Sequence, residues 1–222
     1  MTGTVADRLD VVRARLAAAG AEPGSIQVLA VTKGFGPDVV RAAGAHGLVD
    51  VGENYAQEML AKVDALADLS PAPRWHAIGR LQRNKVRQIA PHVHLWQSVD
   101  RLPLGEEIAR RAPGARVLVQ VDATDEPGKG GCPLAELDRL VGSLIDLGLD
   151  VDGLMTVGPT DPEVDPRPAF DRVRAARDRL GLRTLSMGMS RDLEAAVACG
   201  TTMVRLGTAL FGPRRVSPPG AK

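Results

Sequence analysis

Short runs of apolar residues alternate with helical patterns along nearly the whole chain of 222 residues. Eight of these runs have the length and the apolar character of strands. They are residues 26–33, 48–52, 74–78, 94–97, 115–121, 151–157, 182–186 and 202–206. Strands that alternate with helices form right-handed βαβ units and a parallel sheet. Eight such units can close on themselves, so we predict an α/β protein with a single (β/α)8 TIM barrel.

An extra N-terminal helix is predicted before the first strand, because four apolar residues recur at helical spacing (Val5, Leu9, Val12 and Leu16). The alternative fold is an open, doubly wound sheet, but no GxGxxG motif follows the first strand. No linker divides the chain. We therefore expect one barrel domain over residues 1–212 and a disordered, proline-rich tail over residues 213–222.

The composition of the chain limits the classes of molecule that it can be expected to bind and the cellular compartment in which it is expected. A formal net charge of +1 gives no electrostatic argument for nucleic acid or an anionic membrane, and 3% aromatic residues give few stacking platforms for bases. No apolar run approaches the ~20 residues that span a bilayer. The two cysteines form no CxxC motif, and His92 and His94 lack a third metal ligand. We expect a cytoplasmic protein that binds no metal, nucleic acid or membrane.

A lysine follows the first predicted strand. In a barrel, functional groups gather at the carboxyl ends of the strands, and Lys33 stands at such an end. The chain has only five lysines against 23 arginines. Arginine stays protonated, whereas a lysine with a depressed pKa can attack a carbonyl. Lys33 is therefore a candidate for Schiff-base chemistry, and the alternative is a salt-bridged surface lysine.

The ends of strands seven and eight resemble an anion site. Ser190 follows strand seven at the start of a predicted helix, and Gly207 and Thr208 start a short helix after strand eight. Helix N-termini favour anions through their exposed N–H groups and their dipole, and barrels often bind phosphate at this position. The alternative is that Ser190 and Thr208 only cap their helices.

A phosphate site beside a strand-end lysine indicates a phosphorylated aldehyde held as a Schiff base. Pyridoxal 5'-phosphate is the obvious candidate. Arg205, at the end of strand eight, could meet the pyridine nitrogen of that cofactor. An arginine there would keep the nitrogen unprotonated and make the ring a weaker electron sink.

The same positions resemble the pyridoxal-phosphate homeostasis proteins. The similar blocks are AVTK at 30–33, GENYAQE at 52–58, WHAIGRLQRNK at 75–85, LSMGMS at 185–190 and MVRLGTALFG at 203–212. The resemblance covers nearly the whole chain, from about Ala6 to Gly212. Arg80 and Arg83 depart from the family pattern, in which these positions near strand three are small or neutral.

The resemblance implies a single fold-type-III barrel like the N-terminal domain of alanine racemase. It implies that Lys33 carries the Schiff base and Arg205 faces the pyridine nitrogen. By motif position it also implies that the phosphate is held by Ser190, Gly207 and Thr208. Asn54 falls where the family has an asparagine near the cofactor, and Lys129 matches a loop lysine that the family uses in handling the cofactor.

The function that the resemblance implies is binding of pyridoxal phosphate in vitamin B6 and amino-acid or keto-acid homeostasis, without established catalytic turnover. We expect a monomer, and apo forms of pyridoxal-phosphate enzymes are candidate recipients of the cofactor. One alternative is an amino-acid racemase of fold type III. That chemistry needs a second acid or base, which relatives draw from a further domain, and Tyr55 is the only tyrosine of this chain. A second alternative is a Schiff-base aldolase that needs no cofactor.

Overall fold

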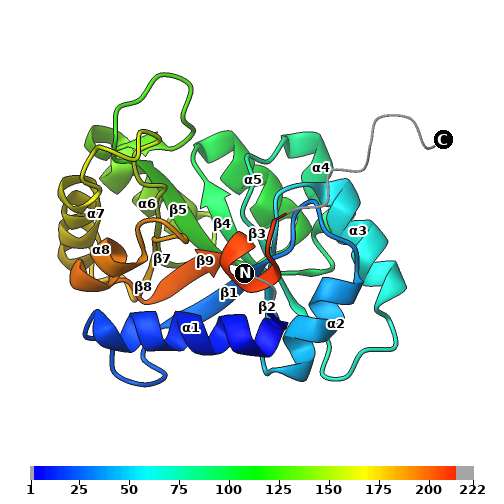
Figure 1. Ribbon diagram of the computed structural model, residues 1–222. Coiled ribbons are helices and arrows are strands. Elements are labelled where there is room, and N and C mark those ends of the chain that lie inside the picture. The colour runs from blue at the N-terminus through cyan, green and yellow to red at the C-terminus, as the bar shows by residue number, and fades with distance from the viewer. Residues whose placement is uncertain (1–2, 214–222) are drawn as a thin grey trace.

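Eight parallel strands close into a barrel in the computed structural model, which describes residues 3–213 (Figure 1). Each strand pairs with its neighbour along the chain, and pairing of β9 with β1 closes the ring. The predicted TIM barrel is therefore confirmed, and the open sheet is wrong. The barrel strands are β1 (Gln27–Val31), β2 (Asp50–Glu53), β3 (Arg74–Ala77), β4 (Val93–Val99), β5 (Arg116–Asp122), β7 (Asp150–Met155), β8 (Thr184–Ser186) and β9 (Met203–Leu206).

Helices surround the barrel and connect successive strands (Figure 1). This arrangement buries the strands on both faces, which explains why they read as nearly continuous apolar runs. The helices are α2 (Asp38–Ala45), α3 (Ala56–Ala65), α4 (Arg83–Ile89), α5 (Leu102–Arg111), the 3-10 turn η1 (Leu134–Glu136), α6 (Leu137–Asp146), α7 (Arg167–Arg179), α8 (Leu193–Ala198) and α9 (Thr208–Phe211).

The extra helix α1 (Val5–Ala18) precedes the barrel, as predicted. It begins with a capping box, in which the side chains of Thr4 and Asp7 accept hydrogen bonds from each other's backbone N–H. Its buried residues Leu9, Val12 and Leu16 join an apolar cluster with residues of β1 and β9. The helix therefore covers the seam at which the barrel closes.

The apolar core has two layers. One layer lies between the strands and the outer helices and contains Trp96, Ile108 and Phe170, each at most 1% exposed. A smaller cluster fills part of the barrel interior and consists of Leu29, Leu95, Leu118, Met155 and Met203 with partly buried neighbours. The remainder of the interior is polar and is described below.

One element of the structure was not predicted from the sequence, and one predicted segment lies almost entirely outside the described residues. A two-residue strand, β6 (Cys132–Pro133), pairs with the end of β5 after the long loop 123–131 and was not predicted. The tail predicted over residues 213–222 lies outside the described residues, apart from Pro213. Within residues 3–213, no helix is long and apolar enough to cross a membrane.

Candidate functional site

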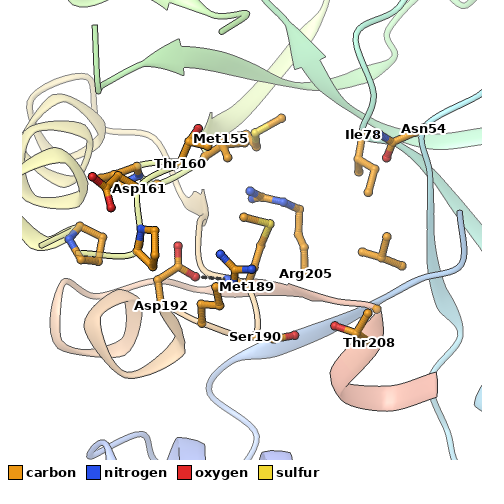
Figure 2. A pocket seen from close by; sticks show the side chains of 18 of the residues that line it. Asn54, Ile78, Met155, Thr160, Asp161, Met189, Ser190, Asp192, Arg205 and Thr208 are labelled. Carbon is orange, nitrogen blue, oxygen red and sulfur yellow. Dashed lines mark hydrogen bonds between the residues drawn. The ribbon is translucent and has the colours of Figure 1, made fainter. Parts of the chain in front are cut away.

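A cavity of about 820 Å³ opens at the carboxyl ends of the barrel strands (Figure 2). Its walls come from segments that follow β1, β2, β3, β7, β8 and β9, which are far apart in the sequence. Six of the residues predicted from the sequence line this one cavity: Lys33, Asn54, Ser190, Arg205, Gly207 and Thr208. The strand-end rule therefore brought these residues together correctly, whereas their roles toward a cofactor stay predictions.

Lys33 lies two residues beyond β1, in a turn, and is partly buried. The preceding residue fixes its position. The Thr32 N–H donates to the Gly52 carbonyl at 3.0 Å, and the Thr32 carbonyl accepts a hydrogen bond from Lys62 Nζ at 2.7 Å. The base of the Lys33 side chain is therefore tied both to the neighbouring strand β2 and to helix α3.

A buried ion pair stands behind this turn. The side chains of Lys62 and Glu53 are 5% and 0% exposed, and Lys62 Nζ contacts Glu53 Oε1. The Thr32 hydroxyl donates to the same carboxylate oxygen at 2.5 Å. Burial raises the pKa of Glu53 even though Lys62 and Thr32 oppose the shift. An ion pair in this place costs desolvation, so its value lies in holding Thr32 in one position.

Asn54 follows β2 and lines the cavity opposite Arg205 (Figure 2). Its backbone packs so closely on Gly79 that a Cβ added at Gly79 would lie 2.3 Å from the Asn54 carbonyl oxygen. The side-chain Oδ1 of Asn54 is buried and accepts no hydrogen bond from any described residue. A buried amide oxygen without a partner is costly, and a ligand with a donor group would remove that cost.

Ser190 and Thr208 both line the cavity, and Figure 2 shows their side chains toward the same end of the view. Helix α8 begins at Leu193 with Asp192 in the cap position, so Ser190 belongs to the preceding turn rather than to a helix start. Thr208 is the first residue of α9, and Gly207 occupies its cap position. Neither Ser190 nor Thr208 occupies an N-cap position, so the alternative that both hydroxyls only cap helices is wrong, and their role toward a phosphate stays a prediction.

Arg205 comes from the interior face of β9 and reaches the middle of the cavity (Figure 2). The residue is buried, with 6% of its surface exposed, and hydrogen bonds fix both terminal nitrogens of the guanidinium group. Nη1 donates to the Ser186 carbonyl at 2.7 Å, and Nη2 donates to the Thr156 carbonyl at 2.7 Å. Burial lowers the pKa of Arg205 to about 10, so the guanidinium remains a cation at neutral pH.

Lys129 does not line the cavity but braces one of its walls. Its Nζ donates to the Gly158 carbonyl at 2.6 Å and to Glu126 Oε1 at 2.9 Å. Glu126 also accepts the Thr160 N–H at 3.0 Å, and these hydrogen bonds from Thr160 and Lys129 lower the pKa of Glu126 to about 2. The loop over residues 123–131 therefore supports the loop that follows β7.

The wall after β7 is the main part of the site that the sequence reasoning missed. Residues 157–162 line the cavity, with Thr160 and Asp161 as their polar members (Figure 2). Arg191, next to Ser190, also lines it. The sequence could have indicated this wall, because a proline-rich loop that follows a barrel strand lies at the end of the barrel where functional groups gather.

The two positions that depart from the resemblance pattern lie elsewhere. Arg80 and Arg83 are exposed, and neither is among the residues that line the cavity. Arg83 instead starts α4 and faces a shallow surface hollow of about 350 Å³ with three other arginines. Their charges are therefore outside the cavity wall.

Comparison with known proteins gives a consistent assignment. The family described as alanine racemase, N-terminal domain, matches residues 7–215. A pyridoxal phosphate homeostasis protein from Pseudomonas aeruginosa is 42% identical, and the alignment covers 97% of this chain and 98% of the relative. The chain belongs to the pyridoxal phosphate homeostasis protein family. A second member, from Escherichia coli, is 38% identical over 96% of this chain.

A solved structure extends the assignment to the fold. PipY of Synechococcus elongatus PCC7942, in a structure with PLP bound, superposes with a TM-score of 0.84. It is 34% identical, and the match covers 94% of this chain and 100% of PipY. The sequence matches show the homeostasis protein family, and the superposition on PipY agrees with the barrel fold.

Proposed function

We propose that this protein binds pyridoxal 5'-phosphate and holds it through a Schiff base on Lys33. One observation carries the proposal: a strand-end lysine, two hydroxyls, a buried arginine and an unpartnered amide oxygen all line one cavity. These groups match the aldehyde, the phosphate and the ring of the cofactor. The bound cofactor in PipY and the names of the relatives support the same proposal.

Each residue has a role that its position supports. Lys33 Nζ, in its neutral form, adds to the aldehyde carbon and forms the C=N bond with loss of water. Ser190 and Thr208 donate their hydroxyls to the phosphate, and the α9 turn at Gly207 offers it backbone N–H groups. Arg205 donates an N–H to the pyridine nitrogen and keeps that nitrogen unprotonated.

The amide of Asn54 completes the site from the opposite wall. Its Oδ1 has no partner among the described residues and can accept a hydrogen bond from a hydroxyl group on the ring. Pyridoxal phosphate supplies an aldehyde and a ring that can withdraw electrons. With a cationic arginine against the ring nitrogen, this withdrawal is weak, which favours storage of the cofactor over chemistry on it.

The physiological role we propose is cofactor homeostasis rather than turnover, with effects on vitamin B6 and amino-acid or keto-acid balance. A racemase needs an acid or base on each face of the cofactor. Among the described residues that line the cavity there is no tyrosine, histidine or cysteine, and the exposed Tyr55 lies outside it. The two carboxylates of the lining already accept backbone hydrogen bonds, Asp161 from the Glu163 N–H at 2.9 Å and Asp192 from the Met189 N–H at 2.6 Å. We propose that the protein acts as a monomer and that apo enzymes receive its cofactor.

Lys129 is proposed to handle the cofactor at the edge of the site. It contacts the Gly158 carbonyl, and Gly158 lines the cavity, so the Lys129 amine lies directly behind the cavity wall. Engaging a second aldehyde would require Lys129 to give up its hydrogen bonds to Gly158, Glu126 and Thr124. The loop over residues 123–131 would then separate from the wall after β7.

The decisive experiment is an absorbance spectrum of the protein incubated with pyridoxal phosphate. We expect a Schiff-base band at about 420 nm that Lys33→Ala abolishes while the far-UV circular dichroism spectrum is unchanged. Lys85→Ala, which changes a lysine of α4 outside the cavity, is the matched control and should keep the full band. A full band in Lys33→Ala would show that another lysine carries the aldehyde.

Two further measurements separate the alternatives. Incubation of the loaded protein with L-amino acids, followed by chiral chromatography, should yield no D-enantiomer above the level of free pyridoxal phosphate. Turnover above that level would favour the racemase. A protein that stays colourless with added cofactor would favour the Schiff-base aldolase.

A further inference from the structure

A continuous chain of buried polar side chains runs from the cavity through the barrel interior to its opposite end. Arg205 Nη1 lies 2.9 Å from Ser186 Oγ, and Ser186 Oγ lies 2.8 Å from Gln97 Oε1. Gln97 Nε2 lies 2.8 Å from His76 Nδ1, and His76 Nε2 lies 3.0 Å from Asp50 Oδ1. All five residues are at most 6% exposed.

The protonation states of His76 and Asp50 determine which atom donates and which accepts in every hydrogen bond of this chain. Burial lowers the pKa of His76, so this imidazole is neutral at pH 7. Burial alone would raise the pKa of Asp50, but hydrogen bonds from His76 and Arg74 outweigh it and hold this pKa well below its ordinary value. Asp50 is therefore an acceptor only, so the imidazole proton lies on Nε2 and Nδ1 is an acceptor.

The protonation state of His76 also fixes which atom donates in each of the other hydrogen bonds of the chain. Because His76 Nδ1 accepts, Gln97 must turn its NH₂ toward His76 and its Oε1 toward Ser186. The Ser186 hydroxyl then donates to Gln97, which leaves an oxygen lone pair facing Arg205. Every donor along the chain points away from Arg205, and Asp50 lies at the far end. Chains of this kind polarise each successive bond.

We propose that Ser186 and Gln97 are positioning residues that aim the Arg205 guanidinium at the ring nitrogen of the cofactor. The inference rests on the proposed function, since it concerns how the same cavity recognises the ring. Without the acceptor on Gln97, the Ser186 proton can rotate toward Arg205. Nη1 then keeps the Ser186 carbonyl but loses the side-chain oxygen, one of the two acceptors that orient it. Neither Ser186 nor Gln97 is among the residues that line the cavity, so both act only through Arg205.

The test compares two ligands that differ only at the ring nitrogen. Pyridoxal phosphate and its 1-deaza analogue, in which a C–H replaces that nitrogen, share the aldehyde and the phosphate. The ratio of their dissociation constants therefore reports the contact with Arg205. Wild type should prefer pyridoxal phosphate, and Arg205→Leu should remove most of this preference.

We expect Ser186→Ala and Gln97→Met to lower the preference about tenfold, which corresponds to ~1.4 kcal/mol. This is at the lower end of the contribution of one hydrogen bond to a charged group. Ser186→Thr keeps the hydroxyl and is the matched control, so it should retain the wild-type ratio. If Ser186→Ala does not fold, Ser186→Cys keeps the side-chain size with a weak acceptor and should lower the ratio as well.

Two outcomes would overturn the inference. If Ser186→Ala and Gln97→Met weaken both ligands equally, the two residues only stabilise the barrel. If the ratio is unchanged, Arg205 needs no support from them. Failure of the proposed function is distinguishable, because wild type would then form no Schiff-base band or would bind both ligands alike.

Discussion

Replacing Lys62 with methionine should destabilise the protein more than any other single change to its lysines. The ammonium of Lys62 is buried against Glu53, whose side chain is fully inaccessible. Methionine fills similar space but leaves the Glu53 carboxylate with the Thr32 hydroxyl as its one remaining hydrogen-bond donor among the described residues. Removing one partner of a buried pair typically costs about 3–5 kcal/mol, because the other charge is left uncompensated. For a protein of this size, the loss corresponds to a fall in Tm of about 6–20 °C.

The pH dependence of the stability of Lys62→Met shows whether the uncompensated Glu53 carboxylate causes the loss. Burial already raises the pKa of Glu53 in the folded wild type, and loss of the Lys62 ammonium raises it further. A carboxyl group with a raised folded-state pKa penalises folding wherever it is ionised in both states. The penalty is therefore complete at high pH and shrinks as pH falls through the folded-state pKa toward the ordinary value of about 4.3. Lys62→Met should thus recover stability between pH 8 and pH 5.

Urea unfolding followed by circular dichroism at pH 8 and pH 5 measures both effects. The double variant Lys62→Met with Glu53→Gln removes both charges and should regain most of the lost free energy of unfolding at pH 8. Lys85→Met is the surface control and should change stability by about 0.5 kcal/mol or less. A loss below 1 kcal/mol for Lys62→Met, or a loss that is the same at both pH values, would refute the reasoning.

Two further predictions concern close packing and buried thiols. Gly79→Ala places a Cβ 2.3 Å from the Asn54 carbonyl oxygen, so we expect a loss of about 1–3 kcal/mol in urea unfolding and weaker binding of pyridoxal phosphate. Gly44→Ala, whose Cβ has a nearest contact at 3.9 Å, is the control and should leave binding unchanged; equal binding by both variants would contradict the role given to Asn54. Burial raises the pKa of Cys132 and of Cys199 to about 11, so both thiols should resist a thiol-reactive disulfide reagent at pH 8 until urea unfolds the chain. Rapid labelling of the folded protein would show that these cysteines are accessible.

The barrel could be predicted because its signal is repeated. The strands are largely buried on both faces, so apolar residues predominate in short runs, and eight such runs alternate with helices. The short strand β6 has only two residues, Cys132 and Pro133, and no periodicity exists in two residues. It arises from the path of the loop over residues 123–131, which returns to the end of β5. Such tertiary pairing leaves no local pattern.

The residues of the site that could be predicted from the sequence are those at or just after the ends of strands. Lys33, Arg205 and Thr208 were found because the end of a barrel strand is a place that the sequence reveals. Lys62 was missed because it lies inside a helix. A signal was nonetheless present: Met59 and Leu66 place Lys62 within the buried stripe of α3, where a charged side chain requires a partner.

The polar chain inside the barrel has a cost that its proposed effect on Arg205 explains. Barrel interiors are usually filled with branched apolar side chains, and apolar replacement of buried polar groups is often neutral or stabilising. Here Ser186, Gln97 and His76 occupy interior positions beside the apolar cluster that includes Leu29 and Met203. A barrel that needed only stability could place leucine or valine there. The charge of Arg205 cannot be buried without acceptors, and a fixed charge at the ring nitrogen requires acceptors that are themselves fixed. The Ser186 and Thr156 carbonyls accept from the guanidinium, and the chain to Asp50 fixes a third acceptor, Ser186 Oγ. The polar interior therefore belongs to the site that we propose for the cofactor.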